Sequence, residues 1–456
     1  MRWSSCLQWL RSPARESTPP PVHSANGNGS IPLVTVERPD DAAPLKCTFE
    51  HLSASEVDAR LRSLAHPETV AFDAHRAARA DAVTFQPCSS ALSQDRYVMR
   101  QLEVHGQRWS FTAVFDGHLG DATVAHTAYH LPIIVTEHLE KRLSAADCSS
   151  GAAVLDPETV RGILSVAITS FDEAIAGDVL ALFPGGLESL SSRTDEEIAT
   201  IINDFEGSGE NYKKAKLCMY GTTALVALVD PSHENLWVAS LGDCEAALAT
   251  PQSSGGWRCE LLNEIHNAQN TAEVERVRRE HPGEPESVLN ERVLGTIAPF
   301  RCIGDTPFKM PAVFTRRILY NLYPGVPDPT PWELFLSRNH TPPYISAVPE
   351  VIHRRLLPTT NSNNTSSPRP FLILATDGLR ELYDGLERKE AAQHWVDVAA
   401  EAFGDVKSPN ANVDNMALRV LRAALGGDDL EAVSQMITLE MESPWIDDTT
   451  VVVRVL

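Results

Sequence analysis

Two apolar, strand-like segments separated by a short polar turn constrain the fold of this chain more than any other feature of its sequence. The segments run from Thr222 to Val229 and from Leu236 to Leu241, and the residues between them are Asp-Pro-Ser-His-Glu-Asn. Turn-forming residues between two short runs of aliphatic residues are typical of a β-hairpin. The sequence therefore predicts an antiparallel sheet.

Three more apolar segments have the composition of strands: Trp109 to Phe115, Phe371 to Ala375 and Thr449 to Leu456. Apolar residues at helical spacing predict helices over residues 121–143 and 157–175. Because the helices are grouped between hairpin-type strands, the pattern indicates an α+β fold with packed sheets and not an alternating βαβ unit.

Two local patterns mark the second half of the chain. Asn270, followed three residues later by Glu273, resembles a capping box and predicts a helix that continues through His281. The stretch PTTNSNNTSSPRP, residues 358–370, has low complexity and precedes an apolar strand. We interpret it as an inserted loop.

Length and charge narrow the class of protein. The chain has 456 residues, which predicts one large catalytic domain with tails and insertions. Its formal net charge of -22 argues against binding to nucleic acid or anionic lipid, because both require a basic surface. No apolar run is long enough to span a membrane, and the eight cysteines have no close pairs, so we interpret them as reduced thiols.

The N-terminal 45 residues differ from the rest. Residues 1–15, MRWSSCLQWLRSPAR, contain three arginines and no acidic residue, a composition compatible with a mitochondrial presequence and equally with an unstructured tail. Residues 12–45 are rich in Pro, Ser, Gly and Asn and are predicted to be disordered. We expect one domain over residues 46–456, with insertions near 184–216 and 358–370.

Acidic residues recur where apolar strands end or begin. Asp95 lies in SQDR, Asp116 in FDGH and Asp377 in TDG, and Asp447 with Asp448 precedes TTVVV. A carboxylate next to a buried strand is held rigidly at the edge of a sheet, and an adjacent glycine lets a backbone carbonyl approach a cation. Oxygen ligands of this kind suit Mg²⁺ or Mn²⁺ and not Zn²⁺.

Taken together, the motifs resemble the protein phosphatase 2C family, over roughly residues 85–456. The motifs that occur in that family's order are SQDR, VFDGH, GTTALVALV, VASLGDCEA, NAQNTAEVERVRREHPGE, RVLGTIAPFRCIGD, ATDGLRELYD and DDTTVVV. Several details are most similar to the pyruvate dehydrogenase phosphatase branch, among them PPYISAVPEV and Asp-Asp near the end. The resemblance implies an α+β fold with a central antiparallel β-sandwich flanked by helices on both faces, and a metal pair at one end.

The resemblance also implies roles for individual residues. Asp116 bridges two divalent cations and the carbonyl of Gly117 completes the shell of one. Asp377 and Asp447 hold the other, and Asp95 orients the water that the cations activate for direct attack on phosphorus.

His118 resembles the family's general acid, which protonates the departing serine or threonine oxygen. Without the motifs, it would be interpreted as a polar residue at the start of the following helix. Glu381 is a candidate ligand for a weaker third cation, or a glutamate that only favours the start of a helix. Cys244 in LGDC is interpreted as a small packed residue.

Two departures leave an alternative open. Gln94 stands where the family commonly has Glu, and Ser90 falls near the position of a phosphate-binding arginine that many members have. A pseudophosphatase that binds a phosphoprotein without turnover is therefore the competing hypothesis. The four carboxylates together with His118 favour an active enzyme.

The expected partner is a phosphoprotein containing phosphoserine or phosphothreonine, with no nucleic acid and no membrane insertion. The expected compartment is mitochondrial or cytoplasmic. The sequence leaves open the physiological substrate, the natural metal and the oligomeric state.

Overall fold

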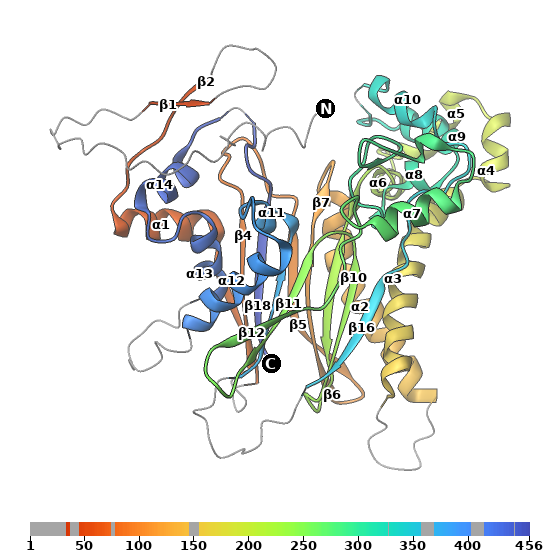
Figure 1. Ribbon diagram of the computed structural model, residues 1–456. Helices are drawn as coiled ribbons and strands as arrows, with labels where there is room; N and C mark the ends of the chain where they lie inside the picture. The colour runs from red at the N-terminus through yellow and green to blue at the C-terminus, as the bar shows by residue number, and fades with distance from the viewer. Residues whose placement is uncertain are drawn as a thin grey trace.

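Two antiparallel sheets face each other at the centre of the molecule, with helices on both outer sides (Figure 1). The computed structural model describes residues 33–36, 45–73, 78–145, 155–326, 328–356, 369–402, 415–441 and 443–456. This arrangement confirms the predicted α+β class and the β-sandwich flanked by helices.

The first sheet has five strands in the order β16-β10-β9-β6-β5. The predicted hairpin is confirmed, because β9 pairs antiparallel with β10. In sequence order the strands are β5 (Arg96–Val104), β6 (Gln107–Phe115), β9 (Ala224–Val229), β10 (Asn235–Leu241) and β16 (Glu350–Arg355).

The second sheet has six strands in the order β12-β11-β17-β18-β4-β3. The predicted strands at Phe371 and Thr449 are β17 and β18, two neighbours at its centre. In sequence order the strands are β3 (Glu68–Asp73), β4 (Ala78–Phe85), β11 (Glu245–Pro251), β12 (Trp257–Leu261), β17 (Phe371–Ala375) and β18 (Thr449–Val455).

Side-chain alternation along the strands separates the cores. In β18, Val451 and Val453 pack against helices on the outer face, whereas Val452 packs between the sheets with Val114 and Leu225. This two-residue period is the one that a strand covered on both faces requires.

Long helices cover the outer faces of both sheets. α2 (Ala122–Ala145) and α3 (Pro157–Leu180) pack on the first sheet through a core that includes Trp109 and Phe111. The second sheet is covered by α1 (Ala54–Ala65), α12 (Arg388–Glu401), α13 (Met416–Ala424) and α14 (Leu430–Thr438).

Shorter elements gather beside one end of the sandwich (Figure 1). They include the predicted insertion near 184–216, which contains three short α-helices, and a three-stranded sheet of order β15-β8-β7. The helices of this group are α4 (Gly186–Ser189), η2 (Leu190–Ser192), α5 (Asp195–Ile202), α6 (Glu210–Leu217), α7 (Thr271–Glu280), η3 (Pro285–Ser287), α8 (Thr306–Lys309), α9 (Ala312–Arg317), η4 (Leu319–Asn321) and α10 (Thr330–Leu336). A further short helix, α11 (Asp377–Glu381), directly follows β17. The small strands are β7 (Gly117–His118), β8 (Gly221–Thr222), β13 (Val288–Leu289), β14 (Arg292–Val293) and β15 (Ile303–Gly304).

The predicted helix at Asn270 is confirmed, but the capping box is wrong. The Asn270 side chain accepts a hydrogen bond from the backbone N–H of Ala272, as an N-cap does. Glu273, however, binds Arg301 and Arg276 instead of the backbone of Asn270. Charge-assisted bonds to two guanidinium groups are stronger than one bond to a backbone N–H.

The N-terminal segment lies mostly outside the described residues, and its predicted disorder and presequence stay predictions. Within it, β1 (Leu33–Val36) pairs antiparallel with β2 (Leu45–Thr48). Most of the predicted loop at 358–370 also lies outside the described residues. None of the helices described has the length and apolar composition needed to cross a bilayer.

Candidate metal centre

Both sheets present carboxylates at the same end of the sandwich. Asp95 immediately precedes β5 and Asp116 immediately follows β6, and these two strand ends pair with each other through Arg96 and Phe115. In the other sheet, the end of β17 pairs with the start of β18, which places Asp377 and Asp447 at the same end of these two central strands.

The backbone of Asp116 is fixed by the neighbouring β8–β9 segment. Its N–H donates to Thr223 Oγ1 at 3.1 Å, and its carbonyl accepts from Thr222 Oγ1 at 2.8 Å. Gly117 is packed so closely that a Cβ there would lie 2.6 Å from the carbonyl oxygen of Gln94. Any side chain at this position would push apart the two loops that carry Asp95 and Asp116.

Two triads of carboxylates could each hold a cation. In each triad, one oxygen per residue lies within 4.8 Å of the others; the first comprises Asp116, Asp243 and Asp377, and the second Asp377, Glu381 and Asp447. The structure thus brings together three of the predicted ligands and Glu381. The second triad supports the interpretation of Glu381 as a candidate cation ligand over its interpretation as a glutamate that only favours the start of a helix.

Asp243 was missed by the sequence analysis. It is buried and follows Gly242 in the tight turn between β10 and β11, where Gly242 has a φ of 113°. Gly242-Asp243 follows a buried strand as the Asp-Gly pairs do, with the two residues in reverse order, and this pattern could have indicated a ligand at Asp243. The prediction for Cys244 in LGDC is confirmed, because Cys244 packs as a small buried residue whose Sγ lies 3.0 Å from Thr223 Oγ1.

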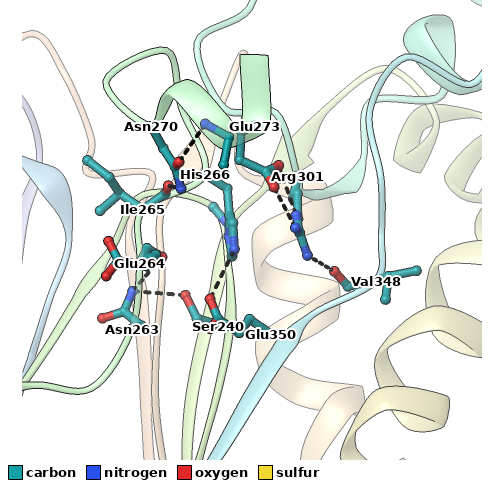
Figure 2. Close-up of polar contacts among 12 residues, drawn as sticks. Ser240, Asn263, Glu264, Ile265, His266, Asn270, Glu273, Arg301, Val348 and Glu350 are labelled. Atoms are coloured by element: carbon teal, nitrogen blue, oxygen red, sulfur yellow. Dashed lines mark hydrogen bonds and ion pairs between the residues drawn. The ribbon is translucent and has the colours of Figure 1, made fainter. Parts of the chain in front are cut away.

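The loop from Asn263 to Asn270 braces the turn that carries Asp243. Figure 2 shows Asn263 reaching toward Ser240, to whose Oγ its amide donates at 3.0 Å. His266 accepts from the N–H of Gly242 at Nδ1, and Asn267 donates to Asp243 itself at 3.1 Å. Asp243 is therefore oriented both by the hydrogen bond that its side chain accepts from Asn267 and by the hydrogen bond that holds the backbone of Gly242.

Asp95 links the two sheets from a fully buried position. The hydroxyl of Thr376, at the end of β17, donates to Asp95 Oδ2 at 2.8 Å. Asp95 Oδ1 is buried without a hydrogen-bond partner, and so is Asp377 Oδ1. Buried carboxylate oxygens without donors are unstable unless a cation or water satisfies them.

The buried carboxylates lie close enough together that their negative charges repel one another. Burial and then the charge of Asp377 raise the pKa of Asp116 well above its ordinary value, and burial and then the charge of Asp243 do the same to the pKa of Asp377. Burial, with the charge of Asp448, raises the pKa of Asp447 to about 6, although Asp447 is exposed at the rim and solvent weakens this effect. Like charges at such distances need compensating positive charge.

These observations fit divalent cations. The candidate ligands are hard carboxylate oxygens, and two buried oxygens, Asp95 Oδ1 and Asp377 Oδ1, have no hydrogen-bond partner. The raised pKa values indicate that the ionised carboxylates are destabilised in the absence of positive charge. Mg²⁺ and Mn²⁺ both suit such oxygens. The arrangement does not discriminate between them.

Asp448 has a role different from that of Asp447. Its carboxylate accepts from the side chain of Gln86 at 2.8 Å and from the backbone N–H of Gln94 at 2.6 Å. It therefore ties the Asp95 loop to the start of β18. The amide oxygen of Gln94 is buried without a hydrogen-bond partner, so the amide at this position keeps an available oxygen.

His118 lies beside the carboxylates and contacts Asp305. Its Nε2 is 2.7 Å from Asp305 Oδ2, and Asp305 is fully buried. Burial lowers the pKa of His118, but the charge and hydrogen bond of Asp305 outweigh it, so this pKa is raised above its usual value. Sequence reasoning missed Asp305, because 187 residues separate it from His118.

Comparison with known proteins supports the same chemistry. The family model for protein phosphatase 2C matches residues 185–410, a range that contains Asp243, Asp305 and Asp377. A mitochondrial pyruvate dehydrogenase phosphatase 1 of Rattus norvegicus is 31% identical over 277 residues, covering 53% of this chain and 49% of the relative. A human mitochondrial pyruvate dehydrogenase phosphatase 2 is 32% identical over 301 residues, covering 57% of this chain and 53% of the relative. A protein phosphatase 2C homolog of Schizosaccharomyces pombe is 26% identical over 368 residues, covering 76% and 73%.

The carboxylate cluster at the end of a two-sheet sandwich and the family match agree, and residues 185–410 of the chain are similar to the protein phosphatase 2C family. The relatives support the pyruvate dehydrogenase phosphatase-like branch that the motifs indicated. The chain spans about half the length of the pyruvate dehydrogenase phosphatases it matches.

Proposed function

We propose that the protein is a metal-dependent serine/threonine protein phosphatase, similar to pyruvate dehydrogenase phosphatase. The observation that carries this proposal is the convergence of Asp116, Asp243 and Asp377 from separate strands onto one point. A module that only bound a phosphoprotein would gain nothing from ionisable groups that repel one another. Within the part of the chain that the structure describes, no contact favours the pseudophosphatase, and that alternative rests on Gln94 and Ser90 in the sequence alone.

In this proposal Asp116, Asp377 and Asp447 hold two divalent cations, with Asp243 and the carbonyl of Gly117 beside them, and Glu381 serves a weaker third ion. When bound, the cations supply Lewis acidity toward water and the phosphoryl oxygens. Asp95, held by Thr376, orients the attacking water. His118 donates the proton to the departing alkoxide, and no covalent enzyme intermediate forms.

We also propose that residues 46–456 form one phosphatase domain and that the substrate is a phosphoprotein. The mitochondrial names of the relatives support a mitochondrial location, with residues 1–45 as the presequence. A reporter carrying residues 1–45 should then enter mitochondria and be shortened at its N-terminus. A diffuse, full-length reporter would favour the cytoplasm.

The decisive experiment compares two substitutions on two substrates. Asp116→Asn should abolish the Mg²⁺- or Mn²⁺-dependent hydrolysis of a phosphoserine peptide, since an amide lacks the negative charge with which Asp116 would hold the cations. His118→Gln should lower the turnover of that peptide by about 10² to 10⁴. It should lower p-nitrophenyl phosphate hydrolysis much less, because that leaving group departs without protonation.

Undiminished turnover in EDTA, or normal activity of Asp116→Asn, would contradict the proposal. Faster hydrolysis of phosphotyrosine than of phosphoserine peptides would also contradict it. A wild-type protein that binds phosphopeptide with metal but never hydrolyses it would identify a pseudophosphatase.

A further inference from the structure

Asp305 and His118 meet because a small sheet places them on either side of one glycine. In the β15-β8-β7 sheet, His118 pairs with Gly221, and Gly304 pairs with the same Gly221 from the other side. Asp305 follows directly, with a left-handed φ of 48°, and its N–H donates to the carbonyl of Tyr220 at 2.9 Å.

Gly221 is the position that makes room for this pair. A Cβ on Gly221 would lie 1.9 Å from Asp305 Oδ2 and 2.5 Å from His118 Nε2. The His118 and Asp305 side chains therefore cross directly over the bare Cα of Gly221. Both side chains are held in a space that no other residue at position 221 would leave open.

Asp305 is braced from behind by a buried polar network. The thiol of Cys302 lies 2.8 Å from the same Oδ2 that contacts His118. Lys309 donates to Asp172 on α3 at 2.6 Å and to the carbonyl of Cys302 at 2.7 Å, and Asp172 also accepts from the N–H of Gly304 at 2.8 Å. The loop that carries Asp305 is thus anchored to a long helix and cannot follow His118 if the imidazole turns.

This geometry selects one form of the imidazole. A carboxylate is an acceptor only, so the His118 nitrogen that faces Asp305 must carry a hydrogen, and Nε2 is that nitrogen. Nδ1 is then the nitrogen left for chemistry. A rotation of the ring would break a short hydrogen bond to a buried carboxylate and leave that carboxylate without this donor.

We infer that Asp305 is a positioning residue for the general acid: by accepting from Nε2 it fixes the orientation and tautomer of His118, so that Nδ1 transfers the proton to the leaving alkoxide. The inference rests on the proposed phosphatase function. Asp305 itself touches neither substrate nor cations in this scheme. During the step, the oxygen of the attacking water forms a new bond to phosphorus while the P–O bond to the serine oxygen breaks. The proton on Nδ1 of the imidazolium moves to the serine oxygen, which leaves a neutral imidazole still hydrogen-bonded to Asp305.

The test uses the full chain with Mg²⁺ and measures turnover of a phosphoserine peptide and of p-nitrophenyl phosphate. Asp305→Ala should lower kcat for the peptide by about 10²-fold, with a much smaller loss for the aryl ester and little change in KM. In a His118→Gln background, Asp305→Ala should cause no further loss. Asp230→Asn is the matched control: it alters a buried aspartate in the β9–β10 turn and should leave the ratio of the two rates unchanged.

A readout independent of activity is the ¹⁵N NMR spectrum of the His118 ring. The protein should show hydrogen on Nε2, and the isosteric Asp305→Asn should shift this tautomer population even if Asp305→Ala fails to fold. Equal losses on both substrates, an additive loss in the His118→Gln background, or an unchanged tautomer in Asp305→Asn would overturn the inference. If the wild-type protein hydrolyses neither substrate, the proposed function is wrong, and the inference about Asp305 is wrong too. If the wild-type protein is active, the results on the Asp305 variants test the role of Asp305 separately from the proposed function.

Discussion

The hydroxyl of Thr376 and the carboxylate of Asp95 join the two sheets at the metal end, across 281 residues of sequence. The same hydroxyl accepts from the backbone N–H of Thr450 at 2.9 Å. One small side chain therefore connects β17, β18 and the loop before β5.

Replacing this hydroxyl should affect both stability and metal binding. Thr376→Val has nearly the same volume but leaves a buried carboxylate oxygen and a buried N–H unpaired, which should destabilise the protein by about 1 to 3 kcal/mol. Because Asp95 is then less well held, Mg²⁺ affinity should also fall. Urea unfolding and a metal titration measure the two effects, and Thr376→Ser, which keeps the hydroxyl, serves as the control.

Two glycines should respond in opposite ways to alanine. At Gly378, a Cβ would lie 2.1 Å from the carbonyl oxygen of Asp448, so Gly378→Ala should displace the start of α11 and its ligand Asp377. At Gly177, inside α3, the space is open, and Gly177→Ala should stabilise the protein by about 0.5 to 1 kcal/mol. Thermal unfolding and Mg²⁺-dependent turnover of both variants test this contrast; equal stability of the two would refute it.

The pH dependence of the metal-free protein should reveal carboxylate repulsion. A carboxyl whose pKa is raised from 3.8 to about 6 by folding, as in Asp447, contributes stability below its unfolded pKa and loses it as pH rises through about 6. Asp447→Asn should therefore match the wild type near pH 4 and be more stable in EDTA at pH 7.5, by about 2 °C in Tm. Saturating Mg²⁺ should reverse that order, since only the wild type binds the ions fully.

Glu273 should show the opposite pH dependence. Although burial opposes it, hydrogen bonds from Arg301 and Arg276 lower the pKa of Glu273 to about 2. Its contribution is complete above the unfolded value of 4.5 and is lost as pH falls toward about 2. Glu273→Gln should cost about 3 kcal/mol at pH 7, because two partly buried guanidinium groups lose their carboxylate. Glu280→Gln, whose exposed carboxylate contacts Arg276 at 2.9 Å, should cost less than about 1 kcal/mol; similar losses would contradict this account.

Local sequence signals predicted the strands and the carboxylates that lie directly at their ends. The positions of Asp116 and Asp377 could be inferred because each follows a continuous apolar run, and such a run has few alternatives to a buried strand. The hairpin from Ala224 to Leu241 was predictable for a similar reason, since its turn residues lie next to it in sequence.

Features that depend on long-range contacts could not be inferred in this way. Asp305 becomes adjacent to His118 only after β8 has brought two distant strands together, and Glu273 left its predicted capping role because Arg301 arrives from 28 residues away. Asp243 illustrates a third limit: its turn is local, but its inclusion in the metal centre is set by the packing of one sheet against the other. A sequence pattern therefore predicts a strand, helix or turn, but it does not predict which distant residues that strand, helix or turn will contact.

The position of β18 in its sheet has a consequence for how the protein is made. β18 lies between β17 and β4, and it is synthesised after every other strand of that sheet. Until residues 449–455 leave the ribosome, β4 and β17 each present an unpaired edge, and Asp447 is absent from the metal end. A nascent chain should therefore depend on chaperones that cover exposed strand edges, and the proposed metal centre can be complete only when synthesis of this strand is finished.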